Sequence, residues 1–365
     1  MEKRQRKKGY PTPFTIDPIS PEHTHTFIVL HGRGSKGEKF GCEFLDYANL
    51  PARLPTVRFV FPTASKRRST IFKKMPINQW FDNYSLDDPN QRTDLQVDGL
   101  METAQFLREL IGTEAQILGG GSGQIGYQKV ILGGLSQGCA AGIFTLLGGG
   151  FGESGNERLG AFIGMSGWLP FEKQLNDMTD DEEEKDEKEE DDQDDEESES
   201  DDSESSDEDE DEEDDDGSDS EARIDVSLSD AASNAVSSGI EVNFAAFDPF
   251  QSETQEDSGR DSHSNIMDVI NHVRDILDLE SVSISGTFSA LQTPVFLGHG
   301  SADPKVSVHL GERMAELLSK KLKMDVTWKA YEGFGHWYKV PDEIDDVLDF
   351  LREKSGLPVV DVSQY

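Results

Sequence analysis

The chain contains little cysteine and no long apolar run. Its two cysteines among 365 residues, Cys42 and Cys139, are too few for a disulfide framework or a cysteine-based metal cluster. No stretch of 18 consecutive apolar residues occurs, so the sequence predicts no transmembrane span. The basic residues 1–8 have no apolar segment after them and do not resemble a secretory signal. We therefore expect a cytoplasmic protein in a reducing compartment, with the basic cluster interpreted as a flexible tail or as a nuclear address.

Negative charge, by contrast, is abundant and unevenly distributed. Of the net charge of −39, residues 177–221 carry −30, from 32 Asp and Glu against two Lys, which leaves −9 for the rest of the chain. Such a segment has too few apolar residues to offset the entropy of ordering, so we predict a disordered acidic insertion over residues 173–263. It is interpreted either as a solubilising loop or as an electrostatic contact for a basic protein partner. Ser198, Ser205 and Ser206 each have an acidic residue three positions later and resemble sites of acidophilic kinases.

Outside this insertion, short apolar runs alternate with helical patterns. The runs that predict buried strands are residues 26–30, 57–61, 130–132, 159–165, 294–297 and 326–331. Apolar residues at helical spacing predict helices over residues 97–110, 266–277 and 344–351. This alternation predicts an α/β fold with a mainly parallel central sheet flanked by helices. We expect one α/β domain split into residues 21–172 and 264–356, with a flexible basic tail at 1–20 and a C-terminal tail at 357–365.

The pattern G-x-S-x-G at residues 134–138 is the most informative local feature. It follows the apolar run at 130–132 and precedes small and apolar residues suited to a helix. A strand, a sharp turn and a helix in this order predict a nucleophile elbow, in which the hydroxyl of Ser136 projects above the sheet. The flanking glycines remove side chains that would clash across such a turn. Ser136 is therefore the candidate nucleophile.

A serine hydroxyl needs an adjacent base, and that base needs a third group to hold it. His336 and Asp303 each follow a predicted strand, where a parallel sheet presents its chemistry. The chain order Ser136, Asp303, His336 is that of α/β-hydrolases. The developing oxyanion needs backbone N–H donors, which we predict to be those of Gln137 and Arg33. The Arg33 side chain is expected to be solvated and without a role.

Six motifs occur in one order: H-G-R-G at 31–34, Q-W-F-D at 79–82, G-L-S-Q-G at 134–138, S-G-W-L-P at 166–170, H-G-S-A-D-P-K-V at 299–306 and Y-E-G-F-G-H at 331–336. Together they resemble the acyl-protein thioesterase family, also called the phospholipase/carboxylesterase family. The resemblance covers about residues 24–172 and 285–354. It implies an α/β-hydrolase fold and a serine hydrolase that uses neither cofactor nor metal. It also implies the catalytic residues Ser136, Asp303 and His336 and the oxyanion donors Arg33 and Gln137. The side chains that we expect to contact the substrate are Trp80, Trp168 and Trp337.

The chain departs from many acyl-protein thioesterases in two places. Ser35 follows the H-G-x-G turn where many of them have Asp, and Trp337-Tyr338 follow the base where many have small residues. Two interpretations of the aromatic pair remain open. The rings narrow the acyl channel, which argues against palmitoyl-length substrates, or they simply pack at the edge of the domain.

Three functions are compared. The leading one is an acyl-protein thioesterase-like serine hydrolase that removes palmitoyl groups from proteins. The alternatives are a small-ester carboxylesterase or lysophospholipase with little action on proteins, and a non-catalytic scaffold that presents the acidic tract. The expected partners are acylated proteins or small and lipid esters, and no nucleic acid. The G-x-G-x-x-G at 121–126 precedes a strand instead of opening a helix, so it does not predict a dinucleotide cofactor.

Overall fold

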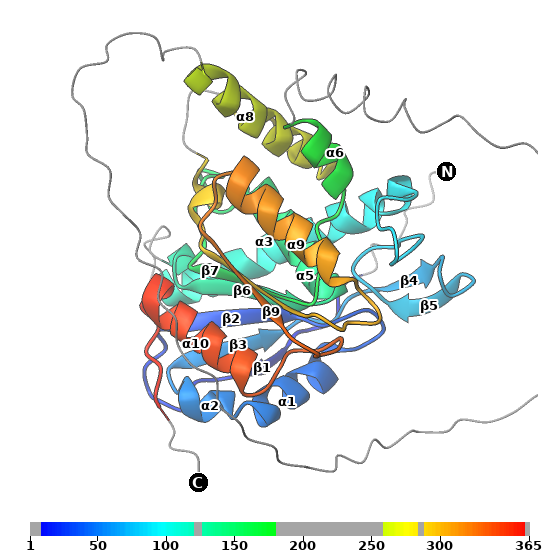
Figure 1. The fold of residues 1–365 in the computed structure, drawn as a ribbon. Coiled ribbons are helices and arrows are strands. Elements are labelled where there is room, and N and C mark those ends of the chain that lie inside the picture. Colours follow the sequence, from blue (N-terminus) through cyan, green and yellow to red (C-terminus); the bar gives the residue numbers. More distant parts are fainter. Residues whose placement is uncertain (1–8, 120–125, 180–257, 284–287, 362–365) are drawn as a thin grey trace, which may run out of the picture. The chain divides into compact units, whose positions relative to one another are not determined.

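A seven-stranded sheet forms the centre of the described chain (Figure 1). The structure, a computed structural model, describes residues 9–119, 126–179, 258–283 and 288–361. The strands lie in the order β1-β3-β2-β6-β7-β8-β9, and every neighbouring pair is parallel except β1 with β3. Their bounds are Phe14–Ile16 (β1), His25–Leu30 (β2), Val57–Phe61 (β3), Val130–Leu135 (β6), Ala161–Met165 (β7), Val295–Gly300 (β8) and Val326–Tyr331 (β9).

Helices cover both faces of this sheet, because successive residues of the strands point to opposite sides. Ile28 and Leu30 of β2 belong to one apolar cluster, and Phe27 and Val29 of the same strand belong to the other. The first cluster is completed by α3 (Val97–Gly119), α5 (Gln137–Gly148), α8 (Ser258–Ile276) and α9 (Val308–Glu316). The second is completed by α1 (Gly37–Tyr47), α2 (Leu50–Arg53) and α10 (Asp342–Ser355). The two groups of helices lie on opposite sides of the sheet in Figure 1.

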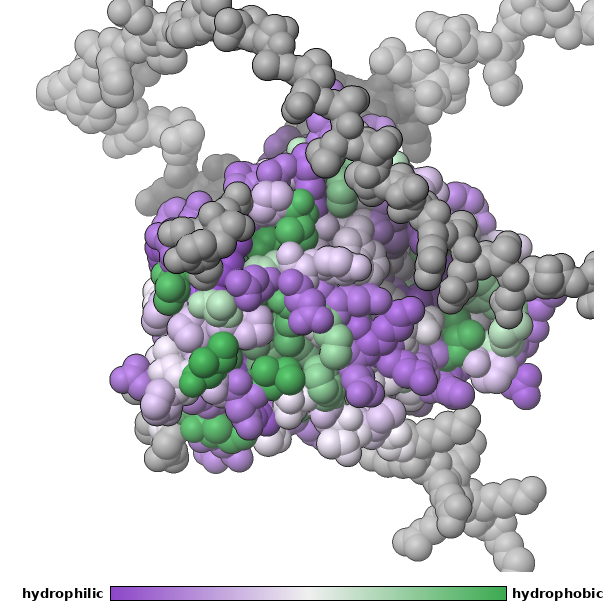
Figure 2. Space-filling view, turned by 90° about the horizontal axis from the view of Figure 1, so that it is seen from below, coloured by the Kyte–Doolittle hydropathy of each residue, from purple (hydrophilic) through white to green (hydrophobic). Residues whose placement is uncertain are grey.

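Shorter elements connect these layers. A separate antiparallel hairpin is formed by β4 (Lys66–Ser69) and β5 (Met75–Asn78). The remaining short segments are η1 (Thr93–Leu95), α6 (Glu172–Asp177), η2 (Ser289–Gln292) and η3 (Leu317–Lys321). Seen from the side of α1 and α10, polar residues surround small separate apolar patches (Figure 2). None of the helices within the described ranges is long and apolar enough to cross a membrane.

The strands and long helices predicted from apolar spacing are present. The predicted strands correspond to β2, β3, β6, β7, β8 and β9, and the predicted helices to α3, α8 and α10. The pattern did not predict α1, α9 or the β4–β5 hairpin. The hairpin strands K-R-R-S and M-P-I-N have no regular alternation of apolar and polar residues, so period-two spacing gives no signal there.

The N-terminal segment corrects the flexible tail expected over residues 1–20. Within it, Phe14–Ile16 pairs antiparallel with β3 as the edge strand β1, and Phe14 lies opposite Phe61. The ring of Tyr10 stacks on Phe106 with centroids 3.9 Å apart, and its hydroxyl is 2.9 Å from Thr103 Oγ1. Three strand residues are too few for a periodicity signal, and the pairing is supplied by a partner far along the chain.

Several sequence expectations concern segments outside the described residues. These are the basic residues 1–8, most of the G-x-G-x-x-G segment at 121–126, the acidic insertion from 180 to 257 and the last residues of the 357–365 tail. The bounds predicted for the insertion, 173–263, include helical residues at both ends. Residues 172–177 form α6, whose Leu175 is buried in the first apolar cluster. At the other end, α8 begins at Ser258, before the predicted return at 264.

Two helical glycines, Gly138 of α5 and Gly112 of α3, differ in the space around them, and we expect alanine to have different effects at the two positions. A Cβ at Gly138 would lie 2.4 Å from the Leu30 carbonyl oxygen, whereas a Cβ at Gly112 of α3 meets only the Tyr127 hydroxyl at 3.3 Å. We expect Gly138→Ala to lower the free energy of unfolding by more than about 2 kcal/mol through overpacking. Gly112→Ala should change it by less than about 1 kcal/mol, since alanine is the better helix former. Urea denaturation of the two variants checks this, and equal midpoints would contradict the packing described.

Candidate active site

Ser136 lies at a strained turn between β6 and α5. Its backbone has φ 56° and ψ −120°, a conformation that a non-glycine residue rarely adopts. The turn is held because the Ser136 N–H donates to the Met165 carbonyl at 2.8 Å. Gly134 and Gly138 make the turn possible, since a Cβ on Gly134 would lie 2.4 Å from the Gly138 carbonyl carbon. The predicted strand, turn and helix are therefore present, and Ser136 retains 8% of its surface exposed.

Asp303 follows β8, and its fully buried carboxylate accepts three hydrogen bonds and also faces His299. Oδ1 accepts from the backbone N–H groups of Lys305 at 2.8 Å and Val306 at 3.0 Å. Oδ2 lies 2.7 Å from His336 Nδ1 and 3.3 Å from His299 Nε2. Burial by itself would raise the pKa of Asp303, but the hydrogen bonds from His299, His336 and the two N–H groups outweigh it and hold the pKa well below its usual range. Asp303 is thus an ionised acceptor.

His336 is carried by the loop between β9 and α10. Because the Asp303 carboxylate can only accept, the Nδ1 of His336 carries the proton, which leaves Nε2 as the basic nitrogen. The loop is fixed at the next residue, where Ser166 Oγ donates to the Trp337 carbonyl at 3.1 Å. Within the described ranges, no hydrogen bond joins Ser136 Oγ to His336; such contacts are commonly loose before substrate binds.

The loops after β8 and β9 approach closely because Gly300 has no side chain. A Cβ at Gly300 would lie 2.3 Å from the Phe334 carbonyl oxygen. With that space free, the Ala302 N–H donates to the Phe334 carbonyl at 2.9 Å, and the Gly333 N–H donates to Ser301 Oγ at 2.9 Å. These contacts hold the loop that carries Asp303 beside the loop that carries His336.

The H-G-R-G turn at 31–34 lies directly beside Ser136. A Cβ on Gly32 would lie 3.6 Å from Ser136 Cβ. The turn is held by His31, whose Nε2 accepts from the Ala64 N–H at 3.0 Å while its Nδ1–H donates to the Gly32 carbonyl at 2.7 Å. Burial lowers the pKa of His31 to about 4, so the ring is neutral and supplies one donor and one acceptor.

The Gln137 side chain clamps the Q-W-F-D segment against the elbow. Its Oε1 accepts from the Trp80 N–H at 3.0 Å, and its Nε2 donates to the Phe81 carbonyl at 2.9 Å. The indole N–H of Trp80 in turn donates to the His31 carbonyl at 2.8 Å. The Ser136 elbow, the H-G-R-G turn and the Trp80 segment are therefore joined by hydrogen bonds.

These contacts correct the substrate-surface role expected for two of the three tryptophans. Trp80 is 0% and Trp168 1% exposed, so both rings are core residues and neither presents a surface to a ligand. Trp168 packs edge-on against Phe81 at 6.1 Å. Trp337 is partly exposed and packs against Phe40 with centroids 6.4 Å apart. Of the three, only Trp337 remains a candidate for substrate contact.

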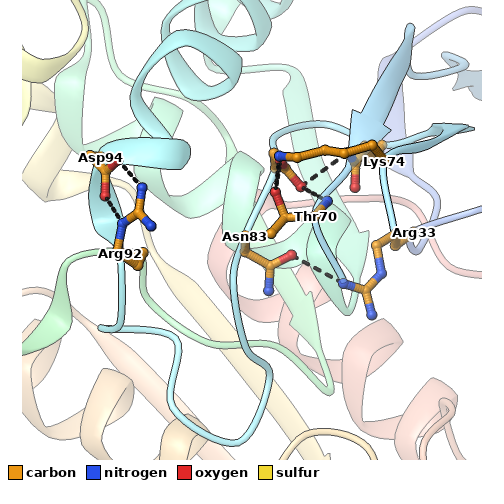
Figure 3. Close-up of polar contacts among 8 residues, drawn as sticks. Arg33, Thr70, Lys74, Asn83, Arg92 and Asp94 are labelled. Atoms are coloured by element: carbon orange, nitrogen blue, oxygen red, sulfur yellow. Dashed lines mark hydrogen bonds and ion pairs between the residues drawn. The ribbon is translucent and has the colours of Figure 1, made fainter. Parts of the chain in front are cut away.

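The Arg33 side chain is also not the incidental, solvated group expected. It is partly buried, and Figure 3 shows it pointing toward Asn83, to whose Oδ1 its Nη1 donates at 3.1 Å. Its guanidinium carbon lies 5.2 Å from the centre of the Phe72 ring. This contact could not be predicted from the sequence, because Asn83 and Phe72 are 50 and 39 residues from Arg33.

The sequence did not predict the supporting roles of His31, Ser166 and Glu343, whereas His299 was expected to affect the turn that carries Asp303. His31 and Ser166 lie inside two of the six motifs, but their roles depend on partners that the fold brings close. No cluster of three or more His, Cys, Asp or Glu suited to a metal ion occurs in the part of the chain that the structure describes.

Comparison with known proteins identifies the family. The family model for phospholipase/carboxylesterase matches residues 12–183 and 277–355. The chain belongs to the phospholipase/carboxylesterase family. This confirms the resemblance seen in the six motifs and places the chain in a family of ester and thioester hydrolases with the α/β-hydrolase fold.

Two curated relatives and one solved structure are similar to it. Acyl-protein thioesterase 1 of Yarrowia lipolytica is 31% identical over 45% of this chain and 66% of the relative, and that of Schizosaccharomyces pombe is 30% identical over 41% and 59%. These matches cover less than two thirds of either relative. The crystal structure of Zea mays acyl-protein thioesterase 2 has a TM-score of 0.54 and 19% identity, covering 95% of this chain and 100% of that one, which supports the shared fold.

The His299–Asp303 contact generates a prediction about positioning. The His299 Nε2–H donates to the Val306 carbonyl at 3.0 Å and faces Asp303 Oδ2. The ring fits because Gly311 has no side chain; a Cβ there would lie 2.6 Å from His299 Nδ1. We expect His299→Leu to lower kcat/KM on a 4-nitrophenyl ester by about tenfold or more, because Asp303 loses a donor. His299→Gln, which restores an amide donor, should stay within about threefold of the wild type.

Gly311→Ala, which crowds the ring, should resemble His299→Leu, and His309→Leu on the exposed start of α9 is the control. Full activity of His299→Leu would rule out the positioning role.

Glu343 generates a prediction about pH. It is fully buried, its Oε2 accepts from the Lys339 N–H at 2.9 Å, and its Oε1 has no hydrogen-bond partner among the described residues. Burial raises its pKa from 4.5 to about 8, with the negative charge of Asp346 adding to the rise and the Lys339 N–H opposing it. The folded state then binds this proton more tightly than the unfolded state, so stability is lost as pH rises from about 4.5 to about 8.

We expect Glu343→Gln to escape that loss. Its free energy of unfolding relative to the wild type should rise by about 4 kcal/mol between pH 5 and pH 8.5. Denaturant melts at both pH values measure this, with Glu332→Gln at an exposed position as the control. A constant difference between wild type and Glu343→Gln would show that the carboxyl is not protonated in the folded state.

Proposed function

We propose that this chain hydrolyses carboxylic esters or thioesters through an acyl-enzyme intermediate on Ser136. The observation that carries the proposal is the 2.7 Å contact between Asp303 Oδ2 and His336 Nδ1, made by loops at the same edge of the sheet as the strained Ser136 turn. This pairing leaves His336 Nε2 as the base, and it needs the ionised Asp303 that the buried hydrogen bonds stabilise.

In the proposed reaction, Ser136 Oγ attacks the acyl carbonyl carbon while His336 Nε2 takes the hydroxyl proton. The tetrahedral oxyanion accepts hydrogen bonds from the backbone N–H groups of Arg33 and Gln137. His336 then returns the proton to the leaving alcohol or thiol as the carbon–oxygen or carbon–sulfur bond breaks. Water repeats the sequence on the acyl-enzyme, releasing the carboxylic acid and free Ser136.

The substrate class we propose is an acylated protein, cleaved at a cysteine thioester such as a palmitoyl group. Support comes from the two relatives, whose name is acyl-protein thioesterase 1. The alternative is a short-chain or lysophospholipid ester. Trp337 packs on Phe40 close to His336, and a ring there would favour shorter acyl chains if it narrows the acyl channel. Relative kcat/KM on thioesters and esters from four to sixteen carbons separates the two.

The nucleophile assignment predicts the outcome of active-site labelling. A fluorophosphonate probe should label the wild type at one serine, and Ser136→Ala should neither be labelled nor retain more than a few per cent of ester turnover. The folded state of Ser136→Ala is checked by circular dichroism, with Ser35→Ala, on the neighbouring turn, as the matched control that keeps both properties. Labelling of folded Ser136→Ala at full yield would overturn the assignment.

We also propose that residues 180–257 are an insertion that the catalytic domain does not need. None of the proposed catalytic residues lies in it, and the family match covers the chain on both sides. Replacing residues 180–257 by a short Gly/Ser linker should leave kcat on a small soluble ester within about threefold, since loop closure depends only weakly on length. A variant that folds but loses turnover on this ester would show that the segment contributes to the site.

A further inference from the structure

The geometry points to the Arg33 guanidinium as a subsite for an anionic group, a carboxylate or phosphate, carried by the substrate next to the reacting carbonyl. This inference rests on the proposed function, because it concerns the substrate of the same site.

Arg33 extends from the turn that contacts the nucleophile. Its neighbour Gly32 would place a Cβ 3.6 Å from Ser136 Cβ, so the Arg33 side chain begins next to the reacting atoms. From there it reaches Asn83 and the Phe72 ring, as Figure 3 shows for Asn83. A ligand bound to Ser136 therefore has a cation within reach of its substituents.

This cation is held by neutral groups. Its one hydrogen-bond partner among the described residues is the Asn83 amide, and Asn83 is itself fixed because its Nδ2 donates to the Ser85 carbonyl at 2.8 Å. No ion pair to Arg33 occurs within the described ranges. By comparison, the partly buried Arg58 pairs with Glu114 at 3.2 Å, and Arg67 pairs with Glu102 at 2.6 Å. Arg33 differs from these two arginines because it forms no ion pair with a carboxylate among the described residues.

The carboxylate whose charge acts on Arg33, Asp82, makes its own contacts with other residues. Its Oδ1 accepts from the Thr70 N–H at 2.8 Å, its Oδ2 accepts from the Thr70 hydroxyl at 2.5 Å, and Lys74 Nζ lies 3.8 Å from Oδ2. It attracts Arg33 only at longer range. Burial lowers the pKa of Arg33, and the charge of Asp82 offsets part of this effect, so the guanidinium is a desolvated and incompletely neutralised cation.

The remaining N–H donors of Arg33 are available to a ligand. Neither Nε nor Nη2 makes a hydrogen bond within the described part of the chain, and neither is among its fully buried polar atoms. A guanidinium presents these donors as a planar fork that matches the two oxygens of a carboxylate or phosphate. Binding such a group would supply the missing negative charge.

The test compares esters that differ only in charge. Mono-4-nitrophenyl adipate carries a carboxylate on the acyl part, and 4-nitrophenyl 6-methylheptanoate is its uncharged isostere. 2-Phosphonoethyl butyrate carries a phosphonate on the leaving alcohol, and 3,3-dimethylbutyl butyrate is its uncharged isostere. The readout is the ratio of kcat/KM for the anionic ester to that for its isostere, so a general loss of activity cancels. The pair that responds identifies which side of the scissile bond carries the anion.

For at least one pair, Arg33→Leu should lower this ratio by about tenfold or more, and Arg33→Lys, which keeps the charge, should lower it less. Lys74→Met removes a nearby exposed cation and should leave the ratio within about twofold, which separates a local contact from diffuse charge. Raising the salt concentration should reduce the ratio in the wild type less than it would for an exposed charge, since Arg33 is partly buried.

An unchanged ratio for both pairs in Arg33→Leu would overturn the inference and leave Arg33 as a structural link between the oxyanion turn and Asn83. An equal fall in Lys74→Met would also overturn it. Absence of Ser136-dependent cleavage of all four esters would instead count against the proposed function, so the two failures are distinguishable.

Discussion

The whole site depends on backbones that approach one another at van der Waals distance around Ser136. A Cβ on Gly138 would meet the Leu30 and His31 carbonyls, and a Cβ on Gly134 would meet Gly138 itself. Because these glycines allow α5 to begin against the end of β2, the nucleophile and the H-G-R-G turn are neighbours before any ligand binds. Strain at Ser136, with φ 56°, is held by this packing and by the bond from its N–H to Met165.

Buried polar groups, some neutral and some charged, then orient the H-G-R-G turn and the Asp303 carboxylate. His31 holds the oxyanion turn as a neutral ring, and Gln137 and Trp80 join that turn to the elbow. On the other side, His299 and two backbone N–H groups hold Asp303 ionised. His31, Gln137 and Trp80 bond to partners far along the chain, whereas Asp303 is held by N–H groups of its own loop and by His299 and His336. The sheet order sets which of these loops lie beside one another.

Much of this arrangement was predictable from sequence, and what was missed has a physical explanation. Apolar runs predicted the parallel strands because both faces of each strand are buried, and the motifs predicted which loops carry Ser136, Asp303 and His336. The edge strand at Phe14–Ile16 and the hairpin at Lys66–Asn78 escaped because short or polar strands carry no periodicity. Trp80 and Trp168 were assigned to a ligand surface because a motif shows which residues recur and says nothing of their burial.

In the proposed reaction, a carbonyl substrate transfers its acyl group to Ser136. Rapid acid quenching of the enzyme during turnover of a 4-nitrophenyl ester, followed by intact mass and peptide mapping, detects this transfer directly. We expect a mass increase equal to one acyl group, located on the peptide at Ser136 and absent from Ser136→Ala. Turnover with the acyl group on another residue, or full turnover by Ser136→Ala, would contradict it.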